Sequence, residues 1–438
     1  MPSFRKTIKK LIPKSLFKKI EPIGHLMEAV LANLVFGFPA RKLKVIGITG
    51  TNGKTTVATL TYNLLKEAGC KAGLMTTVSL DTGEGLKPNV TRLTTISAWD
   101  LIKNIKEVKK SGLDWLVLET TSHGLAQHRT WGVPFYLGIF TNLSHEHLDY
   151  HETLENYKQA KIRLFRLVAK NLRGLRIGIY NADDLVGKEF ANAAPKAISY
   201  GIDQGELRAI NIKDKVDGSS FEVTYHDRHL KIDFGLPGRF NIANALAAIG
   251  AGFVVGLSNQ QIEAGIKTFQ GVEGRMDHIE MGQGFSVIVD YAHTPDSFEK
   301  IFTEMKPLAR GHMIVVFGSA GERDHAKRAI QGELAGKWCD LVVITEEDDR
   351  TENGPEILAE IATGAEKAGK VKNRNLLLIH DRIAAIQKAI GLAQKGDIVL
   401  LLGKGHEKSI LHNGQKMPWD EAETARAAIQ TKLKGESR

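Results

Sequence analysis

The sequence predicts an α/β protein with two parallel sheets, because short β-branched runs alternate with amphipathic stretches over most of its length. One of these runs ends in a glycine-rich turn at residues 50–53, which is typical of a phosphate-binding loop. A second series of such runs begins near Phe285. We therefore expect a central P-loop, parallel-sheet ATPase domain followed by a C-terminal doubly wound, Rossmann-like domain.

Residues 1–42 are predicted to form a separate basic, amphipathic segment. Seven Lys and Arg residues precede the first acid, Glu21; they supply most of the formal net charge of +9 and leave about +2 on the rest of the chain. Apolar residues recur among these lysines at near-helical spacing: Phe4, Ile8, Leu11, Leu16, Phe17 and Ile20. Two interpretations stay open for residues 1–40. They form either a surface helix packed on the protein's own core or a helix in contact with a membrane surface.

Composition and segment length argue against membrane-spanning, secreted, disulfide-rich and nucleic-acid-binding proteins. The apolar stretch at residues 26–39 is shorter than a spanning helix requires and contains Glu28, and no signal-peptide cleavage site follows it. The two cysteines, Cys70 and Cys339, fit neither a disulfide framework nor a thiolate metal site. A cytoplasmic protein is expected, peripheral to the inner face of the membrane if the second interpretation holds. Nucleic-acid binding is not predicted, because the charge lies outside the folded domains.

The central domain is predicted to span residues 43–270 and the C-terminal domain residues 271–438, with the boundary at the Gly271–Gly274 turn. Between Leu207 and Leu236, alternating residues and turn pairs predict a small antiparallel insert. The expected strands of the central domain are Lys44–Thr49, Trp115–Glu119, Leu137–Asn142 and Arg176–Tyr180, followed by helices at Asn241–Val255 and Asn259–Thr268. The expected strands of the C-terminal domain are Ser286–Asp290, Met313–Phe317, Leu341–Thr345, Leu376–Ile379 and Ile398–Leu402.

The strongest local signal is the strand, glycine loop and helix at residues 45–56. Gly50 and Gly53 would let backbone N–H groups approach phosphates, Lys54 would reach the terminal phosphates, and Thr55 would bind magnesium. Ile48 stands where the strict P-loop pattern has glycine, so a chance glycine turn is the alternative.

Two further strand ends carry polar residues. Glu119 ends one predicted strand and is a candidate magnesium ligand, although a solvated glutamate is the simpler explanation of such a position. Residues 141–151 hold three histidines and three acids at another strand end, and zinc is a competing interpretation of that cluster. Lys161 falls in an amphipathic helix, where composition alone indicates a surface lysine.

A series of motifs in order along the chain resembles the Mur ligase family. It consists of Gly50-Thr-Asn-Gly-Lys-Thr-Thr56, Glu119-Thr-Thr-Ser-His-Gly124, the segment 141–151, Ala160-Lys161, Gly238-Arg-Phe-Asn-Ile-Ala-Asn244, Gly274-Arg-Met276, Asp290-Tyr-Ala-His-Thr-Pro-Asp296 and Gly403-Lys-Gly-His-Glu407. The resemblance covers residues 43–432 and is strongest to the branch that adds the third peptide residue to UDP-N-acetylmuramoyl-dipeptide. It implies an ATP-dependent, ADP-forming carboxylate–amine ligase of peptidoglycan precursor synthesis that works through an acyl-phosphate.

The resemblance also implies the site residues. Lys54, Lys161 and His147 are expected to be catalytic. Two magnesium ions are expected on Thr55, Glu119, His147 and a carbamylated Lys161, because an unmodified ammonium has no lone pair to donate. ATP is expected at Gly50, Thr51, Asn52, Gly53, Lys54, Thr55, Thr56, Asn241, Asn244, Arg275 and Asp290. The acceptor is expected at Thr94, Thr95, Thr121, Ser122, Gln127 and Arg129, and the incoming amino acid at Arg323, Asp348, Arg350, Gly403 and Glu407.

Departures from the family pattern bear on the substrates. Only about 40 residues precede the first strand, where the family has a UDP-binding domain of roughly a hundred residues. Residues 347–350 read Glu-Asp-Asp-Arg in place of the Asp-Asn-Pro-Arg of diaminopimelate-selecting ligases. Arg350 fits a distal carboxylate and the three acids favour an amine, so meso-diaminopimelate is the first expectation and another diamino acid the second.

Three function classes are compared. An amide ligase explains the whole motif series, whereas a P-loop phosphotransferase or hydrolase does not explain the motifs beyond the phosphate loop. A catalytically silent nucleotide-binding homologue would be expected to have lost Lys54, Glu119, His147 or Lys161, and all four are present. A Mur-like ligase with a lipid-linked or polyglutamate-type acceptor remains the alternative within the family.

Overall fold

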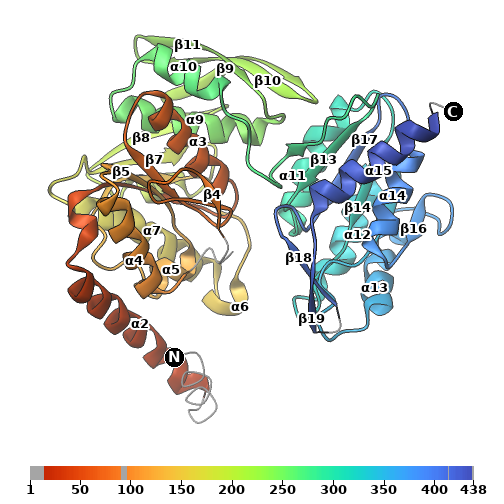
Figure 1. Cartoon of the computed structure of the whole chain (residues 1–438), viewed down its shortest axis with the longest axis horizontal. Coiled ribbons are helices and arrows are strands. Elements are labelled where there is room, and N and C mark those ends of the chain that lie inside the picture. The colour runs from red at the N-terminus through yellow and green to blue at the C-terminus, as the bar shows by residue number, and fades with distance from the viewer. Residues whose placement is uncertain (1–13, 90–95, 413, 437–438) are drawn as a thin grey trace. The chain divides into compact units, whose positions relative to one another are not determined.

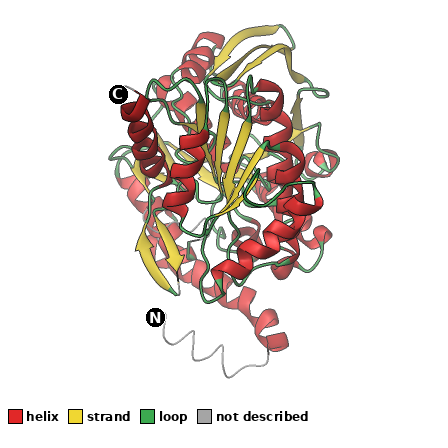
Figure 2. Ribbon diagram, turned by 90° about the vertical axis from the view of Figure 1, so that its right-hand side faces the viewer, coloured by secondary structure: helices red, strands yellow, loops and turns green. Residues whose placement is uncertain are grey.

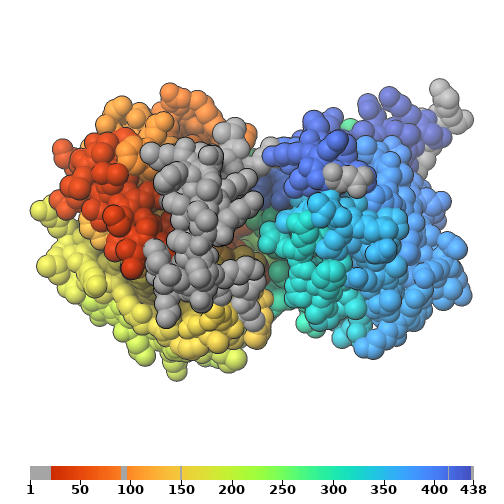
Figure 3. Space-filling view, turned by 90° about the horizontal axis from the view of Figure 1, so that it is seen from below, coloured from red at the N-terminus to blue at the C-terminus, as the bar shows by residue number. Residues whose placement is uncertain are grey.

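The computed structural model describes residues 14–89, 96–412 and 414–436 (Figure 1). The chain divides into two compact units. Unit 1 comprises residues 1–210, 221–232 and 243–269, and unit 2 comprises residues 211–220, 233–242 and 270–438. Figure 3 shows both in space-filling form, with unit 2 coloured mainly turquoise to blue.

A large sheet organises unit 1, in the strand order β11-β10-β9-β8-β7-β6-β1-β5-β2-β3-β4. β1 (Lys44–Thr49) lies between β5 (Trp115–Glu119) and β6 (Phe135–Phe140) and is parallel to both. The carboxyl ends of these three strands therefore meet at one edge of the sheet, which is where ligands bind in parallel α/β sheets. The other strands are β2 (Ala72–Met75), β3 (Ser79–Asp81), β4 (Lys87–Pro88), β7 (Ile177–Asn181), β8 (Lys196–Gly201), β9 (Leu207–Lys215), β10 (Gly218–Tyr225) and β11 (Arg228–Phe234).

The helices of this part of the chain follow the strands as crossover connections. The buried cluster between sheet and helices includes Phe135, Phe140, Phe165 and Phe190, and the Phe140 and Phe190 rings stack at 3.6 Å between centroids. The helices are α3 (Lys54–Glu67), α4 (Ala98–Lys110), α5 (Ser122–Ala126), α6 (Leu148–His151), α7 (Leu154–Lys170), α8 (Gly187–Ala191), α9 (Arg239–Val254) and α10 (Asn259–Lys267), with a 3-10 turn at Pro39–Lys42.

The segment between Leu207 and Leu236, predicted as a small antiparallel insert, forms three consecutive strands, β9, β10 and β11. β9, β10 and β11 are successive neighbours in the same sheet as β1, and β9 pairs in parallel with β8. β8 itself was not predicted, because Lys196–Gly201 carries little hydrophobic signal. The insert is therefore the edge of the main sheet.

The N-terminal helix α2 (Lys14–Phe36) has two contrasting sides. Phe4, Ile8 and Leu11 lie outside the described residues, but from residue 21 onward one side packs on unit 1. His25, Ala29, Ala32 and Asn33 are buried there, and Asn33 Nδ2 donates a hydrogen bond to the Trp131 carbonyl at 2.9 Å. The other side exposes more than half the surface of each of Ile23, Met27, Leu31, Leu34 and Val35. In the described part of the chain, no helix combines the length and hydropathy needed to cross a membrane.

Unit 2 contains a six-stranded sheet in the order β12-β13-β17-β14-β15-β16. β13 (Ser286–Asp290), β17 (Ile398–Leu402), β14 (Met313–Phe317), β15 (Leu341–Ile344) and β16 (Leu376–Leu378) are all parallel. The short β12 (Asp277–His278) pairs antiparallel with β13. These five parallel strands lie where the apolar runs predicted them, within one residue at each end.

Both faces of this second sheet are buried, which explains why its strands read as continuous apolar runs. One cluster packs against α11 (Pro295–Met305), α12 (Ala326–Trp338) and α13 (Gly354–Lys367), and the other packs against α14 (Arg382–Leu392) and α15 (Glu421–Glu436). Figure 2 shows the strands between helices on either side. A 3-10 turn at Lys306–Leu308 and a hairpin of β18 (Ser409–His412) and β19 (Gln415–Pro418) complete the unit.

Candidate active site

The phosphate loop joins β1 to α3, as its sequence predicts. The Thr51 N–H donates to the Asn142 carbonyl at 2.8 Å, and the Asn52 N–H donates to Asn142 Oδ1 at 2.9 Å. Thr141 Oγ1 donates to the Asn52 carbonyl at 2.6 Å. The loop is thus fixed by the residues that directly follow β6, and Lys54 Nζ is held over it by a 2.6 Å hydrogen bond to the Thr51 carbonyl.

The two glycines of this loop leave no room for a side chain. A Cβ on Gly50 would lie 1.8 Å from Thr141 Oγ1, and a Cβ on Gly53 would lie 2.3 Å from Asn244 Oδ1. Gly53 also has φ of 81°, in the left-handed region that favours glycine. Both positions therefore require glycine for packing against Thr141 and Asn244.

Glu119 is buried beside the loop and is not the solvated residue that its position alone suggested. β5 pairs with β1 so that Glu119 lies opposite Ile48. Its Oε2 accepts hydrogen bonds from Thr55 Oγ1 at 3.0 Å and from the Thr77 N–H at 3.1 Å. A hydroxyl and a carboxylate oxygen are ligands that Mg²⁺ prefers, so Thr55 and Glu119 fit one shared magnesium ion next to the phosphates.

Lys161 is fully buried on α7, which contradicts the surface position that its helical pattern indicated. Its Nζ donates to the Gly50 carbonyl at 2.5 Å and lies 4.3 Å from the centre of the Tyr157 ring. Burial lowers the pKa of the Lys161 ammonium well below its usual value, and the positive charge of Lys54 lowers it further. Both effects disfavour the protonated form of the Lys161 amine at the back of the phosphate loop.

His147 lies in the polar segment after β6, with its side chain 44% exposed. Its Nε2 is 3.8 Å from Glu146 Oε2, and its ring centre is 4.8 Å from that of His123 and 6.1 Å from that of Tyr157. Tyr157 in turn hydrogen bonds to Thr51 at 3.2 Å. Among the described residues, the histidines of this segment form no group of three ligand atoms close enough for zinc.

The predicted acceptor residues lie on and after α5, except for two. Thr94 and Thr95 lie outside the described residues. Thr121 caps α5 by accepting a hydrogen bond from the Gly124 N–H at 3.0 Å, and Arg129 donates to the Ile96 carbonyl at 3.1 Å. Ser122 and Gln127 are buried close by in sequence. The Thr121 and Arg129 side chains are thus held by hydrogen bonds to the backbone.

The predicted nucleotide residues of unit 2 adjoin β13. Asp290 ends β13 and accepts hydrogen bonds from the Met276 and Ala292 N–H groups at 2.8 and 2.7 Å. Burial raises the pKa of Asp290, against the lowering effect of Arg275. The Arg275 guanidinium lies 4.6 Å from the centre of the Tyr291 ring. Asn241, at the start of α9, donates to the Pro237 carbonyl at 2.8 Å.

Two of the predicted amino-acid residues, Asp348 and Glu407, meet at a buried lysine to which the sequence assigned no role. Lys404 Nζ binds Asp348 Oδ1 at 2.9 Å and Glu407 Oε2 at 2.5 Å. A Cβ on Gly403 would lie 2.9 Å from Glu347. Arg323, in contrast, is exposed, and no hydrogen bond or ion pair joins it to these residues within the described part of the chain.

Three residues of the site were not identified from the sequence. Lys404 stands inside the Gly403–Glu407 motif, and its position between two acids in the fold was the missing information. Thr77 donates to Glu119 from a loop with no recognisable motif, so no sequence signal identifies it. Tyr157, whose hydroxyl touches the phosphate loop, stands four residues before Lys161 and so shares its helix face.

Comparisons with known proteins identify the family to which the chain belongs. Residues 48–252 match the model of the Mur ligase middle domain, and residues 274–405 match that of the Mur ligase glutamate ligase domain. A UDP-N-acetylmuramyl-tripeptide synthetase of Roseiflexus sp. (strain RS-1) is 42% identical over 420 residues, which cover 93% of this chain and 82% of that protein. A UDP-N-acetylmuramoyl-L-alanyl-D-glutamate–2,6-diaminopimelate ligase of Syntrophomonas wolfei is 37% identical over 408 residues, 93% of this chain and 82% of that protein.

A solved structure bearing the name of that same diaminopimelate ligase aligns with a TM-score of 0.64 at 32% identity, and it covers 89% of this chain and 79% of its own. The similarity thus extends over both units. The chain belongs to the Mur ligase family of ATP- and Mg²⁺-dependent, ADP-forming amide ligases.

Proposed function

We propose that this Mur ligase adds a diamino acid to a UDP-N-acetylmuramoyl-dipeptide-like acceptor, as a cytoplasmic step of peptidoglycan precursor synthesis. The observation that carries the proposal is the convergence of Lys54, Glu119 and the buried Lys161 on one phosphate loop. The names of the two relatives support the acceptor and the amino acid. Residues 43–270 supply the phosphate chemistry in this proposal, and residues 271–438 bind the amino acid.

The reaction joins two substrates through an activated acid. The acceptor carboxylate attacks the γ-phosphorus of ATP, ADP leaves, and an acyl-phosphate forms. The amine of the incoming amino acid then attacks the acyl carbon, loses a proton, and expels phosphate with one of the former carboxylate oxygens. Lys54 and the loop N–H groups offset the negative charge that builds on the transferring phosphoryl oxygens. Magnesium adds charge neutralisation when it is bound at Thr55 and Glu119.

The remaining assignments divide by substrate. Gly50, Thr51, Asn52, Gly53 and Thr56 hold the phosphates. Asn241, Asn244, Arg275 and Asp290 contact the rest of the nucleotide. Thr94, Thr95, Thr121, Ser122, Gln127 and Arg129 bind the acceptor, and His147 joins the magnesium ligands.

Lys161 is proposed to be carbamylated and to hold a second magnesium ion. Its neutral amine adds to carbon dioxide, which forms an N–C bond and releases one N–H proton. The low pKa of Lys161 supports this step, because only the unprotonated amine is a nucleophile. The neighbouring positive charge of Lys54 stabilises the resulting anion.

The carbamate is tested by removing and replacing the carboxylate. In CO₂-free buffer, turnover should fall and return when bicarbonate is added. Lys161→Ala should lose about 100-fold or more in turnover and regain part of it with added acetate, whereas Lys170→Ala, at the exposed end of the same helix, should be unaffected. A bicarbonate-independent rate, or a Lys161→Ala variant that stays active without acetate, would refute the carbamate and leave the ligase assignment standing.

The acidic group around Lys404 supports a diamino acid as the second substrate. Asp348 and Glu407 both face the single ammonium group of Lys404, which leaves one negative charge there to attract the ammonium group of a diamino acid. Arg350 supplies a cation for a distal carboxylate. Diaminopimelate carries both groups on its far end, whereas lysine carries only the amine, so we place meso-diaminopimelate first. Arg323 and Gly403 are proposed as further contacts.

The substrate assignment is tested by a ligation series. The protein is incubated with Mg²⁺, ATP and UDP-N-acetylmuramoyl-dipeptide, and each amino acid is supplied in turn while phosphate release and product mass are followed. A product heavier by diaminopimelate is expected, and Arg350→Ala should reduce turnover with diaminopimelate more than with lysine. Binding of ATP without turnover of any diamino acid would overturn the proposed acceptor.

We also propose that the N-terminal segment touches the inner membrane surface. Ile23, Met27 and Leu31 form an exposed stripe on α2 at helical spacing, and seven Lys and Arg residues precede Glu21. An exposed apolar stripe in a segment whose sequence is basic fits an anionic lipid surface. Binding to vesicles that contain phosphatidylglycerol should be lost when the three residues are changed to serine and kept in Leu185→Ser, which alters an exposed leucine elsewhere in unit 1. Equal binding by both variants would refute the contact.

A further inference from the structure

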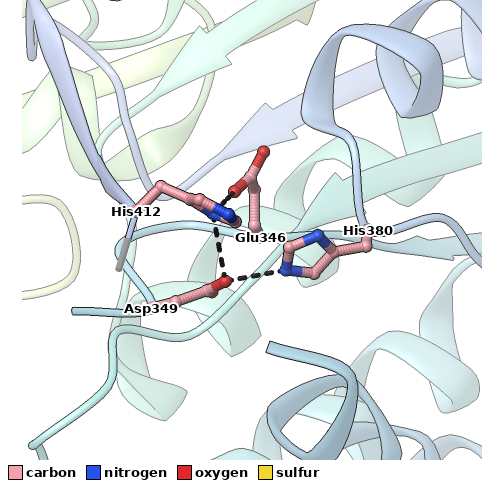
Figure 4. A group of neighbouring side chains, drawn as sticks. All are labelled: Glu346, Asp349, His380 and His412. Carbon is pink, nitrogen blue, oxygen red and sulfur yellow. Dashed lines mark hydrogen bonds and ion pairs between the residues drawn. The ribbon is translucent and has the colours of Figure 1, made fainter. Parts of the chain in front are cut away.

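Four ligand-type side chains converge in unit 2 without a role in the proposed reaction: Glu346, Asp349, His380 and His412 (Figure 4). His380 Nε2 lies 2.7 Å from Asp349 Oδ2, and His412 Nδ1 lies 3.1 Å from Glu346 Oε2. His412 Nδ1 is also 3.6 Å from Asp349 Oδ2. One atom from each residue lies within 4.8 Å of the corresponding atoms of the other three. We refer to these residues as the His–acid cluster.

The cluster joins three segments that are far apart in the sequence. Glu346 and Asp349 follow β15, His380 follows β16, and His412 ends β18. The Glu346 N–H donates to the His380 carbonyl at 3.2 Å, which ties the first segment to the second. The Arg350 N–H donates to the Leu411 carbonyl at 3.2 Å, which ties the first to the third. Backbone hydrogen bonds therefore join the three segments that carry the four side chains.

Gly354 leaves the space in which two side chains of the His–acid cluster, His380 and Asp349, come close together. A Cβ on Gly354 would lie 2.0 Å from His380 Nε2 and 2.4 Å from Asp349 Oδ2, so these two side chains use the space that any other residue would fill. Asp349 is only 2% exposed, and its second oxygen, Oδ1, has no hydrogen-bond partner within the described part of the chain. An unsatisfied oxygen on a buried carboxylate is costly, and a bound cation would offset that cost.

The partners of the two carboxylates in the His–acid cluster also favour a bound cation. Neither Glu346 Oε2 nor Asp349 Oδ2 accepts a hydrogen bond from a lysine or arginine side chain among the residues that the structure describes. The guanidinium of Arg382 interacts with the charge of Glu346, but it donates to the Glu346 carbonyl at 2.9 Å and not to the oxygen that faces the cluster. The neighbouring Asp348, in contrast, is paired with Lys404. Two carboxylates and two imidazoles whose facing oxygens lack such a cation form the ligand set of a divalent metal ion.

We propose that the His–acid cluster binds one zinc ion. Tetrahedral zinc with oxygen and nitrogen ligands at about 2.0–2.2 Å places those ligands about 3.4 Å apart. Three of the separations are 2.7, 3.1 and 3.6 Å, and all four ligand atoms lie within 4.8 Å of one another, so side-chain shifts of up to about 1.4 Å would admit the ion. Imidazole ligands favour zinc over Mg²⁺ and Ca²⁺, which take oxygen ligands.

Four protein ligands would close the coordination sphere, so the ion has a structural role. It fixes residues 346–350 to the β18 strand and to the end of β16. That loop carries Asp348 and Arg350, which are assigned to the incoming amino acid. The effect on amino-acid binding rests on the proposed function, whereas the zinc site itself does not.

The first test measures metal binding without any turnover. The full chain is freed of metal, titrated with Zn²⁺, and analysed for bound zinc by mass spectrometry. One zinc per chain is expected from this site, lost in the His380→Ala/His412→Ala variant and kept in His325→Ala. His325 is a matched control, because it is an exposed histidine of the same unit that also contacts two acids, Glu352 and Glu360. Equal zinc in all three proteins, or none in the wild type, would overturn the proposal.

A second test reads the coordination directly and needs no ligand variant. Co²⁺ substituted into the wild-type chain should give the intense visible absorption of a tetrahedral site. Gly354→Ala, which places a methyl group against His380 and Asp349, should weaken that signal or the affinity by about 100-fold or more. A weak octahedral spectrum, or an unchanged affinity in Gly354→Ala, would show that these four side chains do not form the site. Loss of ligase activity with zinc still bound would instead count against the proposed function alone.

Discussion

Substitution of Gly53 by alanine tests the close packing of the phosphate loop, and Gly69→Ala serves as the matched control. Gly53 precedes α3 and Gly69 follows the same helix, and both have φ of 81°. A Cβ on Gly69 would meet nothing within 4 Å, whereas a Cβ on Gly53 would lie 2.3 Å from Asn244 Oδ1. The two variants therefore share the same backbone strain and differ in the collision.

The expected magnitudes follow from this difference. Left-handed strain of about 1–2 kcal/mol, reduced by the smaller entropy of the unfolded chain, should make Gly69→Ala cost about 1 kcal/mol of unfolding free energy. Gly53→Ala adds an overpacking cost of about 1–3 kcal/mol, because Asn244 must move by about 1 Å to restore ordinary contact. The total should be about 2–4 kcal/mol.

The assay is hydrogen exchange in urea, read from peptides that cover β1 and α3, so that unit 1 is followed by itself. The Gly53→Ala/Asn244→Ala variant removes the collision and keeps the strain, so the two changes should be coupled by about 1–3 kcal/mol. The collision would be refuted by a coupling below about 0.5 kcal/mol, or by equal losses in Gly53→Ala and Gly69→Ala.

Two further predictions concern unit 2. Burial raises the pKa of Glu304 to about 7, from an ordinary value of 4.5. The contribution of the protonated carboxyl to the free energy of unfolding is therefore fully present below pH 4.5 and is lost as the pH rises through 7. Glu304→Gln should therefore have a higher free energy of unfolding than the wild type at pH 8, by about 1–3 kcal/mol, and this difference should shrink towards pH 5. A difference that does not change with pH would contradict the raised pKa of Glu304. Arg382 and Glu421 form a fully buried ion pair with a closest approach of 2.6 Å, so Glu421→Ala should cost about 3–5 kcal/mol in urea unfolding. Glu423→Ala, exposed on the same helix, should change it by less than about 0.5 kcal/mol, and similar losses in both would contradict the argument.

The sequence predicted most accurately the strands that are buried on both faces of their sheet. The five parallel strands of unit 2 are covered on both faces, so each is a continuous apolar run with recognisable ends. The phosphate loop was equally clear, because its glycines sit between a β-branched strand and a helix. β8 escaped prediction, since Lys196–Gly201 is only partly apolar and half exposed, and its assignment depends on pairing with β7 and β9.

The site was harder to predict because its residues depend on tertiary contacts. The helical pattern around Lys161 does not show that its amine reaches the Gly50 carbonyl, 111 residues away. Thr77 and Lys404 take their places from neighbours on other segments. The His–acid cluster draws on three segments with no metal-type spacing, so no motif could have revealed it.

The fate of the acceptor's carboxylate oxygens tests most directly whether the reaction proceeds through an acyl-phosphate. The acceptor is prepared with ¹⁸O in its reacting carboxylate, and the phosphate released during ligation is analysed by mass. Ligation through an acyl-phosphate predicts that each phosphate carries one ¹⁸O atom from the acceptor, in step with formation of the amide. Unlabelled phosphate would mean that water, not the carboxylate, attacks ATP, and it would contradict the proposed ligase mechanism.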